Sequence, residues 1–309
     1  MGATTAIAVE HISKSYGSFR AVDDLTFEVF GGEIFALLGP NGSGKTTTIR
    51  MVLDILRPDT GRISVLGGPL TDQAKNHIGY LPEERGLYRG VPVLDVMVYL
   101  GALKGMPTGA ARRRSLELLE QFELAEYAHK KVSELSKGMQ QKVQFAVTVL
   151  HQPDLIIIDE PFSGLDPVNA LVIKRLLIDM RSAGTAVVMS THQMQQVEEM
   201  ADRLLMIDRG QQRLYGQVDA VREQYAAHAI IVEGQGDWAR LPGVLSVEPV
   251  RATNGDGGGS VLLRLDDHAT TDSVLAAIAA AGDMRIRRFE LAVPSLNDIF
   301  IQVVEGRHE

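Results

Sequence analysis

The sequence predicts an α/β fold in its first two thirds, with a parallel sheet covered by helices, and then a small α+β domain. Short apolar runs from Ile34 onward alternate with longer segments of helical period, the pattern of buried parallel strands and crossover helices. Lysine is absent after Lys174, and beyond about Tyr225 short alternating runs are separated by turns rich in Gly and Asp. We therefore expect a boundary near residue 225, between domains 1–225 and 226–309.

The composition excludes several classes of protein. Of 309 residues, 45% are hydrophobic and 23% charged, so packed cores are expected rather than a disordered or fibrous chain. A net charge of −8 argues against nucleic acid as a partner, because a phosphate backbone is bound by many Lys and Arg side chains. With no cysteine, disulfides, thiolate metal sites and cysteine nucleophiles are excluded, and a reducing cytosol is the default compartment.

No membrane span or export signal is expected. The longest uninterrupted apolar stretch, Val274–Ala281, is far shorter than the roughly 20 residues that a spanning helix needs. The N-terminus lacks the basic and then apolar segments of a signal peptide.

The alternation of strand and helix stops between Val93 and Gln152, that is, over about 93–152. Helical period continues there, and no strand is expected before Leu155. We interpret this segment as a helical insertion in the sheet domain.

The C-terminal part predicts a small ferredoxin-like α+β unit. The expected elements are strands at Ile230–Glu233, Leu245–Val250, Ser260–Leu265 and Arg285–Leu291, a helix from a Thr271 cap to Gly282, and a helix over Ser295–Val304. The run Asn254–Gly259 is interpreted as a hairpin turn rather than an interdomain linker, because it lies between two strand-like segments. No catalytic cluster is found in this unit, for which dimer stabilisation or regulation is expected.

A glycine-rich loop carries the clearest chemical signal. The sequence Gly39-Pro40-Asn41-Gly42-Ser43-Gly44-Lys45-Thr46 fits G-x-x-x-x-G-K-[ST], follows the apolar strand Ile34–Leu38 and opens a helical segment. Glycines allow the backbone to aim N–H groups at phosphates, Lys45 reaches β/γ oxygens, and Thr46 offers a hydroxyl to Mg²⁺. We include Thr47 among the nucleotide contacts. The loop therefore predicts a site for a nucleoside triphosphate.

Two adjacent carboxylates indicate hydrolysis rather than binding alone. Asp159 and Glu160 end the apolar run that starts at Leu155, and side chains alternate in direction along a strand. Asp159 is suited to Mg²⁺, and Glu160 to polarising the attacking water as a general base. Without the glycine-rich loop, such a pair would be interpreted as an ordinary solvated strand end.

A third motif resembles a family signature. Leu135-Ser136-Lys137-Gly138-Met139-Gln140-Gln141 lies between the two sequences above and is similar to the LSGGQ signature of ATP-binding cassette (ABC) proteins. The resemblance extends from Ile7 to about Tyr225. It implies a P-loop ABC cassette, with a RecA-like parallel core and a helical subdomain, that binds ATP and Mg²⁺ and hydrolyses ATP.

The resemblance also suggests roles for three further residues. Tyr16 stands where the family stacks an aromatic ring on adenine, although a Tyr before Gly is more often a surface residue. Asp166, in Ser163-Gly164-Leu165-Asp166, matches a loop that crosses the dimer interface; it is also a good helix N-cap before Pro167. His192 corresponds to the family's switch histidine, which contacts the γ-phosphate and the attacking water.

Ser136 and Gly138 begin a helix and form an anion-binding helix terminus. In the family, two cassettes pack head to tail, so that each signature closes over the triphosphate held by the other copy. The resemblance therefore implies a homodimer that ATP closes and hydrolysis opens.

Some positions depart from the common pattern. Lys137 and Met139 replace a Gly and a Gln of the signature. Glu83, in Tyr80-Leu81-Pro82-Glu83, stands where a glutamine usually touches Mg²⁺, and Glu84 is the alternative for this place.

The signature, the Glu83 segment and the extra C-terminal unit together resemble ABC-2-type exporter ATPases, including those similar to the sodium-efflux ATP-binding subunit. The resemblance implies ABC-2-type membrane permease partners, contacted by the helical insertion, and a peripheral location on the cytoplasmic face of the membrane. The alternatives are a soluble ABC-type ATPase that acts on ribosomes or DNA, and a regulator that binds ATP without turnover.

Overall fold

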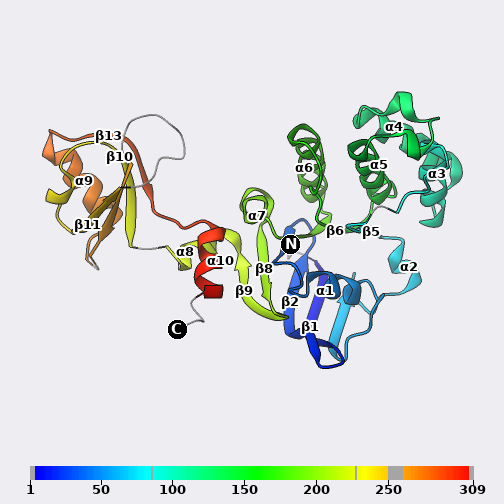
Figure 1. The fold of residues 1–309 in the computed structure, drawn as a ribbon, viewed down its shortest axis with the longest axis horizontal. Helices are drawn as coiled ribbons and strands as arrows, with labels where there is room; N and C mark the ends of the chain where they lie inside the picture. Colours follow the sequence, from blue (N-terminus) through cyan, green and yellow to red (C-terminus); the bar gives the residue numbers. More distant parts are fainter. Residues whose placement is uncertain (1–3, 85, 227, 250–259, 267, 306–309) are drawn as a thin grey trace. The chain divides into compact units, whose positions relative to one another are not determined.

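The computed structural model describes residues 4–84, 86–226, 228–249, 260–266 and 268–305 (Figure 1). Its internal contacts divide the chain into two compact units, Met1–Val218 and Asp219–Glu309. The turn expected at Asn254–Gly259 lies outside the described residues. Within the described part of the chain, no helix combines the length and apolar character needed to cross a bilayer.

A six-stranded sheet forms the centre of the N-terminal unit. In spatial order it contains β5 (Ile78–Leu81), β6 (Leu155–Asp159), β7 (Ala186–Thr191), β3 (Ile34–Leu38), β8 (Arg203–Asp208) and β9 (Gln211–Gln217). The first five strands are parallel, and β9 runs antiparallel to β8. Every residue of β3, β6 and β7 is buried, as the continuous apolar runs predict for a parallel sheet covered on both faces.

Helices follow the strands as expected for an α/β fold (Figure 1). The sheet domain contains α1 (Lys45–Val52), α2 (Asp72–Lys75), α6 (Pro167–Ser182) and α7 (Met194–Met200). The helical subdomain contains α3 (Val93–Leu103), α4 (Thr108–Gln121), η1 (Ala125–Tyr127), η2 (Val132–Glu134) and α5 (Lys137–Val149). Its core includes the buried rings of Phe122 and Phe145, which pack edge-on with ring centroids 6.1 Å apart.

A second, antiparallel sheet was not foreseen from the sequence. It has the order β2 (Phe19–Phe30), β1 (Thr5–Tyr16) and β4 (Thr60–Val65). Phe27 of β2 stacks on Phe35 of β3, with ring centroids 5.6 Å apart, and both rings are buried. This contact joins the two sheets in one core, which places the β1–β2 turn beside the loop that follows β3.

The C-terminal unit is a four-stranded antiparallel sheet with helices, as expected. Its strands have the order β11 (Val244–Pro249), β12 (Ser260–Leu265), β10 (Ala229–Gln235) and β13 (Arg285–Leu291). This is the strand order of a split βαβ unit, in which the first crossover is reduced to the short η3 (Trp238–Arg240). Its helices are α8 (Val218–Gln224), α9 (Thr271–Ala281) and α10 (Leu296–Glu305).

One detail of this unit corrects the sequence interpretation. Thr270, and not Thr271, caps α9: its hydroxyl accepts a hydrogen bond from the Ser273 N–H at 3.1 Å. The Ser273 hydroxyl in turn accepts one from the Thr270 N–H at 2.9 Å, which completes a capping box. By sequence, either of the two adjacent threonines could be the N-cap. Only the reciprocal contact with Ser273 identifies Thr270.

Candidate functional site

The glycine-rich loop runs from the end of β3 to the first turn of α1. Gly39 and Gly44 have φ angles of 156° and 114°. A Cβ atom at Gly39 would lie 2.2 Å from the Ile207 carbonyl oxygen, and one at Gly44 would lie 2.5 Å from that of Ala21. Neither position has room for a side chain, so these glycines permit the close approach of the loop to β8 and β2.

We expect Gly39→Ala to destabilise the N-terminal unit by about 1–3 kcal/mol, because the added methyl group collides with backbone that cannot move aside. Gly42→Ala is a matched control, since Gly42 has a φ of 78° but a Cβ there meets open space. Gly42→Ala should lower the free energy of unfolding only by the smaller amount, about 1 kcal/mol, that alanine costs in a left-handed backbone conformation. Urea unfolding measures both; equal losses would contradict the steric explanation.

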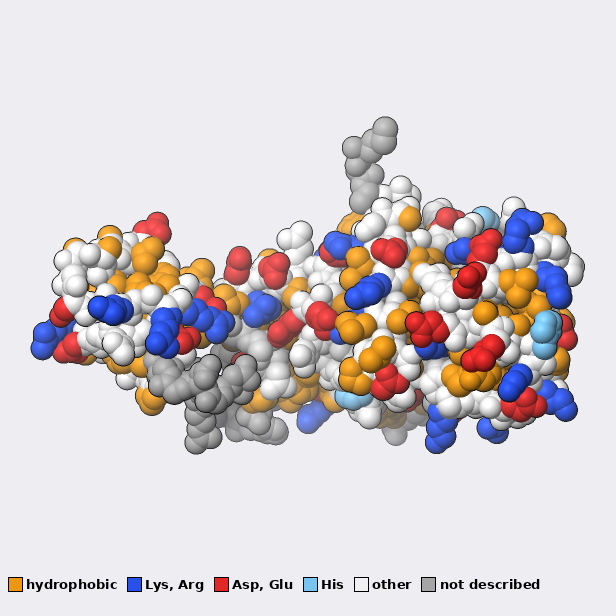
Figure 2. All heavy atoms as spheres, turned by 90° about the horizontal axis from the view of Figure 1, so that it is seen from above, with side chains coloured by type: hydrophobic (Ala, Val, Ile, Leu, Met, Phe, Trp, Pro, Cys, Tyr) orange, Lys and Arg blue, Asp and Glu red, His pale blue; other side chains and the backbone are white. Residues whose placement is uncertain are grey.

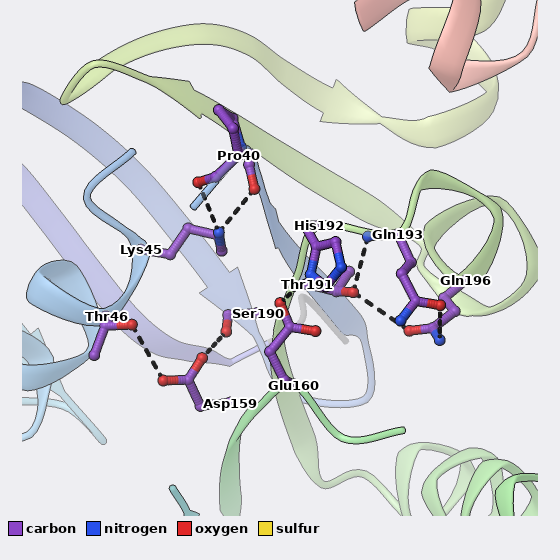
Figure 3. A network of polar contacts seen from close by, with 11 residues as sticks. Pro40, Lys45, Thr46, Asp159, Glu160, Ser190, Thr191, His192, Gln193 and Gln196 are labelled. Carbon is purple, nitrogen blue, oxygen red and sulfur yellow. Dashed lines mark hydrogen bonds and ion pairs between the residues drawn. The ribbon is translucent and has the colours of Figure 1, made fainter. Parts of the chain in front are cut away.

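Lys45 begins α1 and is nearly buried, with 6% of its surface exposed. Its Nζ donates hydrogen bonds to the carbonyl oxygens of Gly39 at 2.7 Å and Pro40 at 3.1 Å (Figure 3). Burial lowers the pKa of Lys45, and the negative charges of Glu160, Asp159 and Glu83 oppose this shift. The ammonium group is therefore held at the loop by two backbone carbonyl oxygens.

Asp159 ends β6 and is also nearly buried, with 4% exposed. Figure 3 shows Thr46 and Ser190 reaching its carboxylate from opposite sides. The Thr46 hydroxyl donates to Oδ2 at 3.2 Å, and the Ser190 hydroxyl donates to Oδ1. Ser190 was not singled out from the sequence; it lies opposite Asp159 in the β6–β7 register.

The oxygens near Asp159 fit Mg²⁺ bound together with a nucleotide. In the described ranges, no group of three or more His, Cys, Asp or Glu side chains is arranged to hold a metal ion alone. Mg²⁺ commonly takes one or two protein oxygens and completes its shell with phosphates and water. The Thr46 hydroxyl and the Asp159 carboxylate are such a pair.

Glu160 follows β6 and turns back toward the end of β7. Its φ of 52° is in the left-handed region, and its N–H donates to the Ser190 carbonyl oxygen at 3.0 Å. The Glu160 Oε1 lies 2.7 Å from the His192 Nδ1 (Figure 3). The Glu160 side chain is 9% exposed and the His192 side chain 49% exposed, so the carboxylate is sheltered while the imidazole faces the open side.

The His192 loop is fixed by its neighbours. The Gln193 N–H donates to the Thr191 hydroxyl at 3.1 Å, and this hydroxyl donates to Gln196 Oε1 at 3.3 Å. The Gln196 amide donates to Gln193 Oε1 at 2.7 Å (Figure 3). These bonds hold the start of α7 against the end of β7 and orient His192 toward Glu160.

One pocket of about 440 Å³ gathers most of the predicted residues. Predicted residues that line it are Tyr16, Asn41, Gly42, Gly44, Lys45, Thr46, Thr47, Glu83, Asp159, Glu160 and His192. Phe19, Ala21 and Ser163 also line it and were not predicted. Gly39, Pro40 and Ser43 belong to the same loop but do not line the pocket.

Glu83 and Glu84, although adjacent, have different surroundings in the structure. Glu83 lines the pocket, whereas the Glu84 carbonyl oxygen accepts a hydrogen bond from the Gln144 amide of α5 at 3.2 Å. Of these two residues, Glu83 is thus the one that lines the pocket.

Ser136, Gly138 and Asp166 do not line this pocket. Ser136 is exposed and caps α5, and its hydroxyl accepts from the Met139 N–H at 3.3 Å. Asp166 caps α6 through a hydrogen bond from the Asn169 N–H at 3.0 Å, which lowers the pKa of its carboxyl group. Within one copy, Ser136 and Asp166 act as helix caps.

The comparisons with known proteins agree with this geometry. Residues 22–163 match the family model described as ABC transporter, and residues 216–304 match that of the C-terminal domain of DrrA1-3-like ATP-binding proteins. The chain is 39% identical, over 98% of its length and 100% of the relative, to the uncharacterized ABC transporter ATP-binding protein YhaQ of Bacillus subtilis (strain 168). It is 29% identical, over 96% of its length and 92% of the relative, to the daunorubicin/doxorubicin resistance ATP-binding protein DrrA of Streptomyces peucetius.

Solved structures give the same result. A structure of the ATP binding subunit of an ABC transporter superposes with a TM-score of 0.67 at 31% identity, covering 72% of this chain and 93% of that one. The resemblance recognised in the signature sequence is therefore confirmed. This chain belongs to the ABC transporter family, as an ATP-binding and ATP-hydrolysing subunit that energises transport through membrane subunits.

Proposed function

We propose that the chain binds Mg-ATP in the 440 Å³ pocket and hydrolyses it there. The observation that carries this proposal is the convergence of the glycine-rich loop, Asp159 and the Glu160–His192 pair on one cavity. The N–H groups of the loop and the Lys45 ammonium hold the β- and γ-phosphates. Thr46, Asp159 and Glu83 would hold Mg²⁺, which would neutralise charge on the phosphoryl group when bound.

Glu160 acts as the general base in this proposal. Its carboxylate accepts a proton from the attacking water, and the sheltered position favours one orientation of that water. His192 holds the Glu160 carboxylate through the 2.7 Å contact and presents its second ring nitrogen to the γ-phosphate. Tyr16 supplies an aromatic face for the adenine.

We further propose that the site is completed by a second copy of the chain, packed head to tail. Ser136 and Gly138 open α5, a 13-residue helix whose first N–H groups attract anions, yet they do not line the pocket of their own chain. In the homodimer they contact the triphosphate bound by the partner, and Asp166 lies at the interface. ATP then stabilises the closed dimer, and hydrolysis opens it.

Membrane permease subunits of the ABC-2 type are the proposed transport partners, on the cytoplasmic face of the membrane. Relatives named for drug resistance, such as DrrA, support export of small molecules. Nucleic acid is not a proposed partner: on the face shown in Figure 2, Lys and Arg side chains are interspersed with Asp and Glu and form no continuous basic field. We assign nucleotide chemistry to domain 1–225 and dimer stabilisation or regulation to 226–309.

Cysteine cross-linking tests the head-to-tail homodimer, because the natural chain has no cysteine. Asn41 and Lys137 are exposed and lie in the glycine-rich loop and the first turn of α5. One tagged chain carries Asn41→Cys and a second, of different size, carries Lys137→Cys, both with Glu160→Gln to prevent hydrolysis. We expect mild oxidation to join the two different chains in Mg-ATP and not without nucleotide.

Ile55→Cys replaces Asn41→Cys in the control, since Ile55 is 63% exposed but outside the pocket. The control pair should remain unlinked. If the Asn41→Cys and Lys137→Cys chains give no mixed product in saturating Mg-ATP, or give the same amount as the control, the head-to-tail arrangement is wrong.

A further inference from the structure

We propose that Phe19 is a second aromatic contact for the nucleotide base, so that the β1–β2 turn offers two rings rather than the one ring of Tyr16. The inference rests on the proposed function of the 440 Å³ pocket as an ATP site. Phe19 is then a further residue that determines the affinity for ATP, and it does so through the base and independently of the triphosphate.

The hairpin geometry places the two residues directly opposite each other. Tyr16 ends β1, Phe19 begins β2, and the two are direct partners in the antiparallel register. Only Gly17 and Ser18 separate them, and Gly17 has a φ of 60° that suits a two-residue turn. Directly opposite residues project to the same side of a hairpin, with Cβ atoms about 4.5–5.5 Å apart.

Both rings are uncovered on the side of the phosphate loop. Tyr16 is 50% exposed and Phe19 is 61% exposed, and both line the pocket that contains Lys45 and Thr46. Among the described residues, neither ring belongs to an aromatic pair. Exposure of a phenylalanine ring to water is unfavourable, and covering it with a flat apolar ligand removes this cost.

The chemistry of the ring indicates the ligand class. Phenylalanine has no hydrogen-bonding group, so it recognises the π-face or edge of a base and not its pattern of donors and acceptors. Base stacking on an aromatic side chain changes affinity by about 5- to 150-fold when the ring is removed. Two such rings predict strong dependence on the presence of a base and tolerance between adenine and guanine.

The test compares ATP with inorganic tripolyphosphate, which has phosphates but no base. Affinities of the full-length chain for both ligands, with Mg²⁺, are measured by calorimetry for the natural chain, Phe19→Ala and Phe19→Trp. We expect Phe19→Ala to weaken ATP binding about 10-fold and leave tripolyphosphate binding unchanged. Phe19→Trp should keep or increase ATP affinity, and GTP should follow ATP in every variant.

Ile55→Ala is the matched control, since Ile55 is similarly exposed but does not line the pocket. Unchanged ATP affinity in Phe19→Ala would overturn the inference and leave the ATP site intact. Equal losses for ATP and tripolyphosphate would also overturn it, because the effect would then come from the phosphate loop. If the natural chain binds tripolyphosphate but not ATP, the proposed function itself fails.

Discussion

Glu160→Gln is expected to lower the rate of ATP hydrolysis by about 10²–10⁴-fold, the usual contribution of a general base. Glutamine has nearly the same shape as glutamate, so the contact with His192, now 2.7 Å long, can be retained through the amide. The amide cannot accept the proton of the attacking water. The left-handed backbone at Glu160, with a φ of 52°, is unaffected by the change of one side-chain atom.

The same variant should still bind ATP, and its dimer should therefore accumulate. Phosphate release measures turnover, and light scattering after gel filtration in saturating Mg-ATP measures the mass. Glu84→Gln is the matched control, because Glu84 is adjacent to the pocket residue Glu83 but does not line the pocket. A Glu160→Gln chain that hydrolyses ATP at the natural rate would exclude Glu160 as the base. A chain that stays monomeric with ATP bound would instead contradict the dimer.

Lys45→Ala is expected to weaken ATP binding by more than 10-fold, because hydrogen bonds to charged groups contribute about 1.5–3 kcal/mol. The loss has a second cause. Lys45 interacts electrostatically with Asp159, Glu160 and Glu83, and without its positive charge the repulsion between these carboxylates and the triphosphate increases. Calorimetry with ATP and Mg²⁺ measures the change.

Lys75→Ala controls for the removal of a lysine charge, since Lys75 pairs with Asp72 on α2 and does not line the pocket. Its ATP affinity should match the natural chain. If Lys45→Ala retains natural affinity and turnover, the glycine-rich loop is not the phosphate site. Circular dichroism of each variant confirms that the fold is retained.

The glycine-rich loop and the two carboxylates at the end of β6 were identifiable from local sequence alone. A motif such as Gly39–Thr46 combines residues whose spacing itself creates the chemistry, since the backbone N–H groups, the lysine and the hydroxyl are consecutive. The alternation of apolar runs and helical segments likewise indicated a parallel sheet, because burial on both faces demands continuous apolar strands. The roles of these residues in binding and hydrolysis stay predictions that the variants above would test.

Other residues of the site depended on which strands become neighbours. Ser190 meets Asp159 because β6 and β7 are adjacent, and Phe19 reaches the pocket because the core contact between β2 and β3 brings the β1–β2 turn to the phosphate loop. No local pattern marks a serine at a strand end or an exposed phenylalanine as functional. The distinction between Glu83 and Glu84 likewise came from the direction of the chain after β5.

Local sequence thus predicts one part of the fold and the site, and packing between distant segments determines the other part. Consecutive residues supply phosphate-binding groups, helix caps and apolar strands, since each of these depends on backbone and side chains within a few positions. The partners of Asp159 and the exclusion of Ser136 from the pocket of its own chain depend on contacts between residues distant in sequence. Such contacts are selected by the packing free energy of the whole core, which no single segment contains.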